Sequence, residues 1–309
     1  HPDHEFLYES DLFDGLEEHK TEPTLYSKVG VLDKIKSIKN FDDSKTWKFV
    51  NGFFSHLTYW DYNLLRHNLD IMHIEKNVCE NIYGTLLGIE GKSKDNLKAR
   101  LDLQDMKIRP ELHPQKKNND KYFLPPASYT LSKKQKQQFC KVLHDIRVPD
   151  GYSGNISRCV NVSEGRISGL KSHDCHILMQ QLLPVALRGL LPDNVTSVLF
   201  DLCAYFREVS AKVLHVRDLE KLEQRIKITL CHMEMIFPHG FFTVMVHLVL
   251  HLATEAKIGG PVAYRSMWFL ERYFVKNEIY IFSNYYYTTF INIFCLLFSF
   301  FIYAGIFVS

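Results

Sequence analysis

The chain has 309 residues, enough for two domains or for one large domain with appendages. Its hydrophobic content of 46% and charged content of 23% are ordinary for a globular protein and argue against a disordered chain. The net charge of +2 is uninformative by itself, but its distribution is uneven: residues 1–22 are acidic, and residues 92–147 hold fourteen Lys and Arg against six Asp and Glu. The basic middle segment predicts either a contact with a polyanion or a solvated loop.

The seven cysteines form no C-x-x-C pair, and their number is odd. No signal peptide is visible at the start of the chain, because its first residues are charged. The number and spacing of the cysteines, together with the charged start of the chain, predict free thiols in a reducing compartment rather than a disulfide framework. The chain does not begin with Met, and we therefore expect a fragment of a longer protein.

Residues 1–60 read as loop with short aromatic clusters. A helical pattern follows from about His67 to Leu87, and Gly88 and Gly91 mark its end. The apolar residues near one face of this helix are Ile71, Ile74, Val78 and Ile82. Beyond it, residues 91–164 are basic and punctuated by prolines, as is typical of a linker region.

The rest of the chain, up to the tail, reads as a packed helical domain. Ser132 is placed to cap a first helix, Pro184 is expected to kink a second, and Asp193 or Asn194 is placed to cap a third. Gly259-Gly260-Pro261 predicts a break. Beyond the helix that Ser132 caps, helices are predicted over residues 173–189, 194–215, 218–236 and 240–257.

The tail differs from the rest, since residues 279–309 contain no charged side chain. Residues 290–308 are almost wholly apolar, and a helix needs roughly 20 such residues to cross a bilayer. The tail is therefore a candidate transmembrane helix, and it predicts a membrane location.

Six long blocks, in the order given, resemble the transposases of plant CACTA-type (En/Spm) DNA transposons and the helical domain of unknown function (family 4218) that follows the transposase core. The blocks are residues 64–87 (LLRHNLDIMHIEKNVCENIYGTLL), 94–105 (KDNLKARLDLQD), 148–159 (VPDGYSGNISRC), 169–183 (GLKSHDCHILMQQLL), 245–256 (MVHLVLHLATEA) and 259–264 (GGPVAY). The similarity ends near residue 273, where the tail begins.

The resemblance implies a mainly α protein in which the remnant of an RNase H-like transposase core is followed by a helical domain and a hydrophobic C-terminal helix. The expected segments are the core remnant at 1–90, the basic Pro-containing linker at 91–164, the helical domain at 165–275 and the tail at 279–309. The resemblance also implies DNA as the partner, a nuclear location by descent, and Mg²⁺ as the cofactor. The upstream acidic residues of the family are absent from this chain, so we expect a truncated copy without strand-transfer activity.

RNase H-like transposases use carboxylates to hold two divalent metals. The candidates here for a late carboxylate are Asp70 and Glu75, which lie about 140° apart around a helix and are therefore unlikely partners at one metal. We favour Asp70. The alternative is a structural cluster in which Asp70 caps the helix and His67 or His73 pairs with it.

A second constellation combines His173, Cys175 and His176 with the pair His247 and His251. Histidines four apart face the same way on a helix, a spacing that is used for zinc, and Cys175 and His176 would complete four ligands if the two helices packed together. The alternative for the pair is a satisfied feature of the core.

Two basic clusters are candidates for contacts with DNA phosphates, and the alternative is again a solvated linker. They are Lys116-Lys117 and Lys133-Lys134-Lys136. The sequence as a whole predicts a transposase-derived fragment that binds DNA or protein, with no small-molecule substrate. The alternative is a helical interaction module that residues 290–308 anchor to a membrane.

Overall fold

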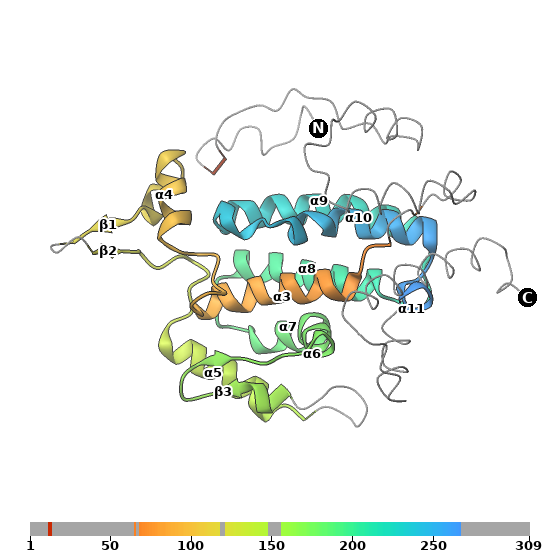
Figure 1. Ribbon diagram of the computed structural model, residues 1–309, viewed down its shortest axis with the longest axis horizontal. Helices are drawn as coiled ribbons and strands as arrows, with labels where there is room; N and C mark the ends of the chain where they lie inside the picture. Colours follow the sequence, from red (N-terminus) through yellow and green to blue (C-terminus); the bar gives the residue numbers. More distant parts are fainter. Residues whose placement is uncertain (1–11, 14–64, 66–67, 118–120, 148–155, 267–309) are drawn as a thin grey trace, which may run out of the picture. The chain divides into compact units, whose positions relative to one another are not determined.

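The computed structural model describes residues 12–13, 65, 68–117, 121–147 and 156–266 (Figure 1). The apolar tail of residues 279–309, with its candidate membrane span, lies outside these residues, as does most of the loop-like segment 1–60. Of the helices that are described, none has both the length and the hydropathy that crossing a bilayer requires. The described chain is mainly helical, as predicted.

Helix α3, Ile71–Leu87, forms the helix predicted over 67–87 but begins four residues later. Asp70 occupies the N-cap with extended backbone angles, so α3 begins directly after it. Gly88 ends the helix with φ 61°, a left-handed conformation that glycine adopts without steric cost. Most of α3 from Val78 to Leu87 is buried, so this helix runs through the middle of the fold rather than over its surface (Figure 1).

The basic segment predicted as a linker is structured where the model describes it. Ser132 starts α5 with a capping box, in which Ser132 Oγ accepts from the Gln135 amide and the Gln135 side chain accepts from the Ser132 amide. The predicted cap is thereby confirmed. The elements are α4 (Leu97–Asp105), η3 (Pro110–Leu112), β1 (Gln115–Lys116), β2 (Tyr122–Phe123) and α5 (Lys133–Asp145).

Two small antiparallel hairpins are the only sheets within the described ranges. β1 pairs with β2 in the register Gln115 to Phe123 and Lys116 to Tyr122, and all four side chains are exposed. This hairpin projects from the helices at the left of Figure 1. The second hairpin follows η4 (Ile156–Cys159) and consists of β3 (Val160–Asn161) and β4 (Arg166–Ile167), which contact α5.

The remaining helices follow the predicted order, but several of their bounds differ, and the helix expected over 194–215 ends at Val209. The helix expected over 173–189 is divided by a π-helical turn, in which the Leu183 amide donates to the Leu178 carbonyl. Pro184 directly follows and has no amide hydrogen for an α-helical bond, which favours the wider turn. The elements are α6 (Ser172–Ile177), η5 (Leu178–Leu182), α7 (Leu183–Ala186), α8 (Asp193–Val209), α9 (Val216–Ile236), η6 (His239–Phe241), α10 (Val244–Gly259) and α11 (Val262–Arg265).

The predicted cap of α8 is wrong. Pro192 occupies the N-cap without a side-chain hydrogen bond, and Asp193 lies in the first turn, where its negative charge interacts favourably with the helix dipole. Proline at this position fixes φ at −58° and so sets the entry of the chain into the helix. The predicted break is confirmed, because α10 ends at Gly259 and Gly260 adopts φ 75°.

Helix α3 packs against α6 and against α10, which lie on different sides of it (Figure 1), and α9 packs against α8 and α10. One hydrophobic core includes buried side chains from α3, α4, α5 and all helices from α6 to α11. The packing is therefore continuous across residues 90 and 164. The segment boundaries expected at residues 90 and 164 stay predictions about which part of the transposase family each segment descends from.

Candidate functional site

Asp70 serves as the cap of α3. Its Oδ1 accepts a hydrogen bond of 3.1 Å from the His73 amide, one of the four amides that a helix start leaves without a partner. The side chain is exposed. The structure thus confirms the capping role that the sequence analysis gave as the alternative to catalysis.

We expect Asp70→Ala to lower the free energy of unfolding by about 1 kcal/mol, the usual value of an N-cap hydrogen bond. Asp70→Asn should lose much less, because its amide oxygen accepts the same bond. Urea denaturation with far-UV circular dichroism measures both. Equal losses in the two variants would show that the charge, and not the cap, is what matters.

Glu75 is a residue of α3 and is fully buried, with a relative exposure of 0%, where α3 packs against α6 and the π-helical turn. Its Oε2 lies 2.6 Å from His176 Nδ1, and its Oε1 accepts 3.0 Å from Gln180 Nε2. Gln180 also donates to the Phe206 carbonyl of α8, at 3.2 Å. Burial raises the pKa of the Glu75 carboxyl, and the bond with His176 opposes that rise.

Three buried thiols surround this pair. Cys79 on α3 interacts with Cys175 on α6, and this hydrogen bond, together with burial, raises the pKa of the Cys79 thiol. Burial raises the pKa of Cys203 on α8 as well. The reactive form of cysteine is the thiolate, so the arrangement does not provide an activated nucleophile next to Glu75 and His176. The contacts are those of a paired polar group within a core.

The five predicted zinc ligands are not brought together. Cys175 is buried towards Cys79, His176 is bonded to Glu75, and the ring of His173 stacks 6.2 Å from that of His176. His247 and His251 lie on α10, whereas the other three belong to α6. Both helices pack against α3, which separates them, and the described ranges hold no group of three or more His, Cys, Asp or Glu arranged for a metal ion.

The alternative prediction for the histidine pair on α10, a satisfied feature of the core, is wrong as well. His247 and His251 are both exposed, and their Nε2 atoms lie 3.3 Å apart. Only the side of α10 that carries Val246, Val249 and Leu252 is buried.

The two candidate carboxylates, both among the described residues, do not fit a catalytic Mg²⁺ site. Such a site needs carboxylate oxygens that converge on one position and remain open to water and substrate. Asp70 is committed to its helix start, and the oxygens of Glu75 are sealed in the core with His176 and Gln180.

The β1–β2 hairpin is an exposed basic element. Lys117 and Lys121 flank its tip, and Tyr122 and Phe123 are 44% and 40% exposed. Lys117 Nζ lies 4.6 Å from the centre of the Phe123 ring, a cation–π contact. The hairpin therefore presents positive charge and aromatic surface together.

The second basic cluster is only partly a surface feature. Lys133 and Lys134 are exposed in the first turn of α5, but Lys136 donates to the Leu87 carbonyl at the end of α3. Partial burial lowers the pKa of Lys136. The structure thereby corrects the prediction that all three lysines are candidates for DNA contacts, because Lys136 joins α5 to α3.

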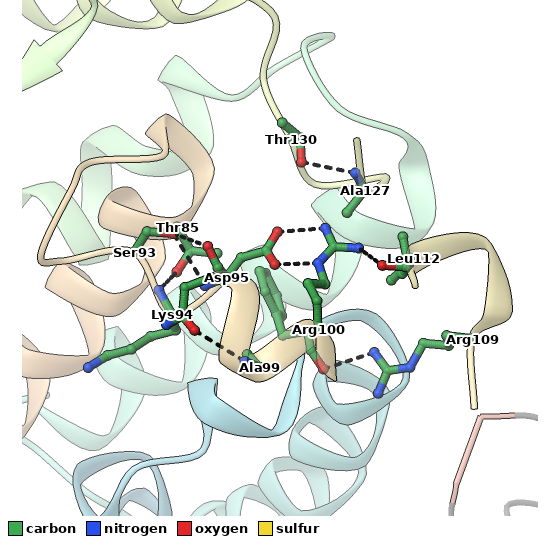
Figure 2. Close-up of polar contacts among 12 residues, drawn as sticks. Thr85, Ser93, Lys94, Asp95, Ala99, Arg100, Arg109, Leu112, Ala127 and Thr130 are labelled. Carbon is green, nitrogen blue, oxygen red and sulfur yellow. Dashed lines mark hydrogen bonds and ion pairs between the residues drawn. The ribbon is translucent and has the colours of Figure 1, made fainter. Parts of the chain in front are cut away.

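The base of the hairpin is fixed by two arginines that the sequence analysis counted only as basic linker residues. Arg100 of α4 makes two bonds to Asp95 and donates to the Leu112 carbonyl at 3.1 Å (Figure 2). Arg109 donates to the Phe237 and Glu234 carbonyls at the end of α9, each at 2.9 Å. The sequence signal was their position among apolar residues, next to Ala99 and Ile108, both of which are buried.

The fold and these contacts define a mainly helical protein with an anchored basic hairpin and with its two candidate carboxylates in structural roles. Residues 209–288 match the family described as Domain of unknown function (DUF4218), which is found in plant transposase-like proteins. The match begins at the end of α8 and includes α9, α10 and α11. Neither the curated proteins nor the solved structures contain a match to this chain.

Proposed function

We propose that this protein is a transposase-derived DNA-binding module, of CACTA-type (En/Spm) descent, that does not itself catalyse strand transfer. The descent rests on the ordered blocks of the sequence and on the DUF4218 match. A remnant of the RNase H-like core at residues 1–90 and a nuclear location form part of the same proposal. The side chains of Asp70 and Glu75 already make structural contacts, which supports the proposal that the protein does not catalyse strand transfer.

The single observation that carries DNA binding is the exposed β1–β2 hairpin. Lysine ammonium groups bind phosphates and release counterions, which gives affinity without sequence preference. Exposed aromatic rings next to them stack on bases or insert between base steps. Lys117, Lys121 and Phe123 provide this combination on an element whose base Arg100 and Arg109 hold in place.

The test compares two triple variants that remove the same charge. Lys116→Ala/Lys117→Ala/Lys121→Ala removes the lysines of the hairpin, and Lys212→Ala/Lys221→Ala/Lys227→Ala removes exposed lysines between α8 and the middle of α9. We expect the hairpin variant to bind a short duplex at least tenfold more weakly and to lower the salt slope of binding by about 2–3, since each phosphate contact contributes about 0.9. Fluorescence anisotropy over a series of salt concentrations measures both.

Equal losses in the two variants would show that net charge, and not the hairpin, determines binding. Unchanged binding in both variants would remove the hairpin as the DNA-binding element, and absence of binding by the wild type would remove DNA as the partner. For the non-catalytic part, purified protein should not nick transposon-end DNA in the presence of Mg²⁺. Robust nicking that Asp70→Ala abolishes would overturn that part.

A further inference from the structure

Helix α10 carries an exposed pair of imidazoles that neither the core nor the hairpin uses. His247 and His251 are four residues apart, so they lie one above the other on the same face of the helix. Their ring centroids are 5.1 Å apart and the rings are inclined by 71°. The two Nε2 atoms face each other at 3.3 Å.

We propose that His247 and His251 form a two-ligand chelating site for a divalent transition-metal cation such as Zn²⁺ on the exposed face of α10. Two nitrogens that each lie about 2.0–2.1 Å from a tetrahedral Zn²⁺ are about 3.3 Å apart. The observed separation of the Nε2 atoms matches that distance without a change of the helix. Neutral imidazole is a preferred ligand of Zn²⁺, Cu²⁺ and Ni²⁺.

A carboxylate on the next turn of α10 is already paired with an arginine. Glu255 lies one turn beyond His251, and its carboxylate interacts electrostatically with that histidine. Glu255 is not itself a ligand, because its Oε2 accepts 3.0 Å from the Leu69 amide and 3.2 Å from Arg265 Nη1. The Arg265 guanidinium offsets the charge of this carboxylate, so the two histidines are the protein ligands of the site, and water fills the remaining positions around the metal.

In the absence of metal, one imidazole N–H donates to the other ring, which explains the same short separation. On metal binding that proton moves to Nδ1 of the same ring, both Nε2 atoms become free to ligate, and the cation ties two successive turns of α10 together. Because the helix holds the two nitrogens at this spacing, the metal binds the folded chain more tightly than the unfolded chain and stabilises the fold by mass action. The site is independent of the hairpin, so the DNA-binding variants above leave it intact.

The experiment titrates Zn²⁺ into the full chain, kept reduced, by isothermal calorimetry. We expect one Zn²⁺ per chain and at least a tenfold loss of affinity in both His247→Gln and His251→Gln. His144→Gln, which changes an exposed histidine of α5, is the matched control and should bind like the wild type. The rise of the melting temperature with Zn²⁺ should disappear in the two α10 variants only.

Both substitutions are on the surface, so circular dichroism should show unchanged helix content. Wild-type affinity in either α10 variant would place the bound metal elsewhere, for example on thiols, and would overturn the proposal. Absence of Zn²⁺ binding to the wild type would overturn it equally.

Discussion

Replacing Glu75 with alanine is expected to lower the free energy of unfolding by about 3 kcal/mol, more than any single cap or surface pair. The substitution removes the acceptor of Gln180 Nε2, which is buried, and the partner of His176 Nδ1. It also leaves a space between α3 and α6 that neighbouring side chains fill only in part. Urea denaturation at neutral pH measures the loss.

Glu75→Gln is the matched control, because it keeps the shape of the side chain and removes its charge. Burial raises the pKa of Glu75 above its usual value of 4.5, so the folded protein holds this proton more tightly than the unfolded chain does. The part of the stability that is linked to protonation of Glu75 is therefore fully present below pH 4.5 and is lost as the pH rises through the folded-state pKa.

We accordingly expect the stability of Glu75→Gln, relative to the wild type, to increase with pH above 4.5. His176 faces the same carboxylate and also titrates, so the double variant with His176→Gln is needed to separate the two groups. A difference between wild type and Glu75→Gln that does not vary between pH 4.5 and 7.5 would contradict a raised pKa.

Replacing Arg100 with alanine is the second substitution with a large expected effect, again about 3 kcal/mol or more. The guanidinium is 1% exposed and makes two bonds to Asp95 and one to the Leu112 carbonyl, so its loss leaves a partly buried carboxylate and a buried carbonyl without their partner (Figure 2). Arg100→Lys should also be strongly destabilising, because an ammonium group cannot make the paired contact.

Arg225→Ala provides the comparison. Arg225 pairs with Glu208 at 2.7 Å, but the two side chains are 41% and 42% exposed, and such surface pairs contribute about 0–1 kcal/mol. Chemical denaturation of the three variants under one condition tests the ranking. A loss for Arg225→Ala as large as that for Arg100→Ala would show that burial does not decide the effect.

The sequence by itself determined the features that depend on neighbours along the chain. The helix over 71–87 follows from the spacing of its apolar residues, and its end follows from Gly88. The cap at Ser132 follows from Gln135 three residues later. Such signals are readable because helix hydrogen bonds and caps join residues three or four positions apart.

Only the tertiary structure decided the environment of the polar residues. Glu75 and His176 are 101 positions apart, and their contact exists because α3 packs on α6. Arg109 donates to carbonyls at the end of α9 that are more than a hundred positions away in the sequence. Its guanidinium therefore stabilises the fold and is not open to bind a partner. Whether a charged side chain is buried with a partner or open to ligands depends on distant segments of the chain, and no local pattern specifies it.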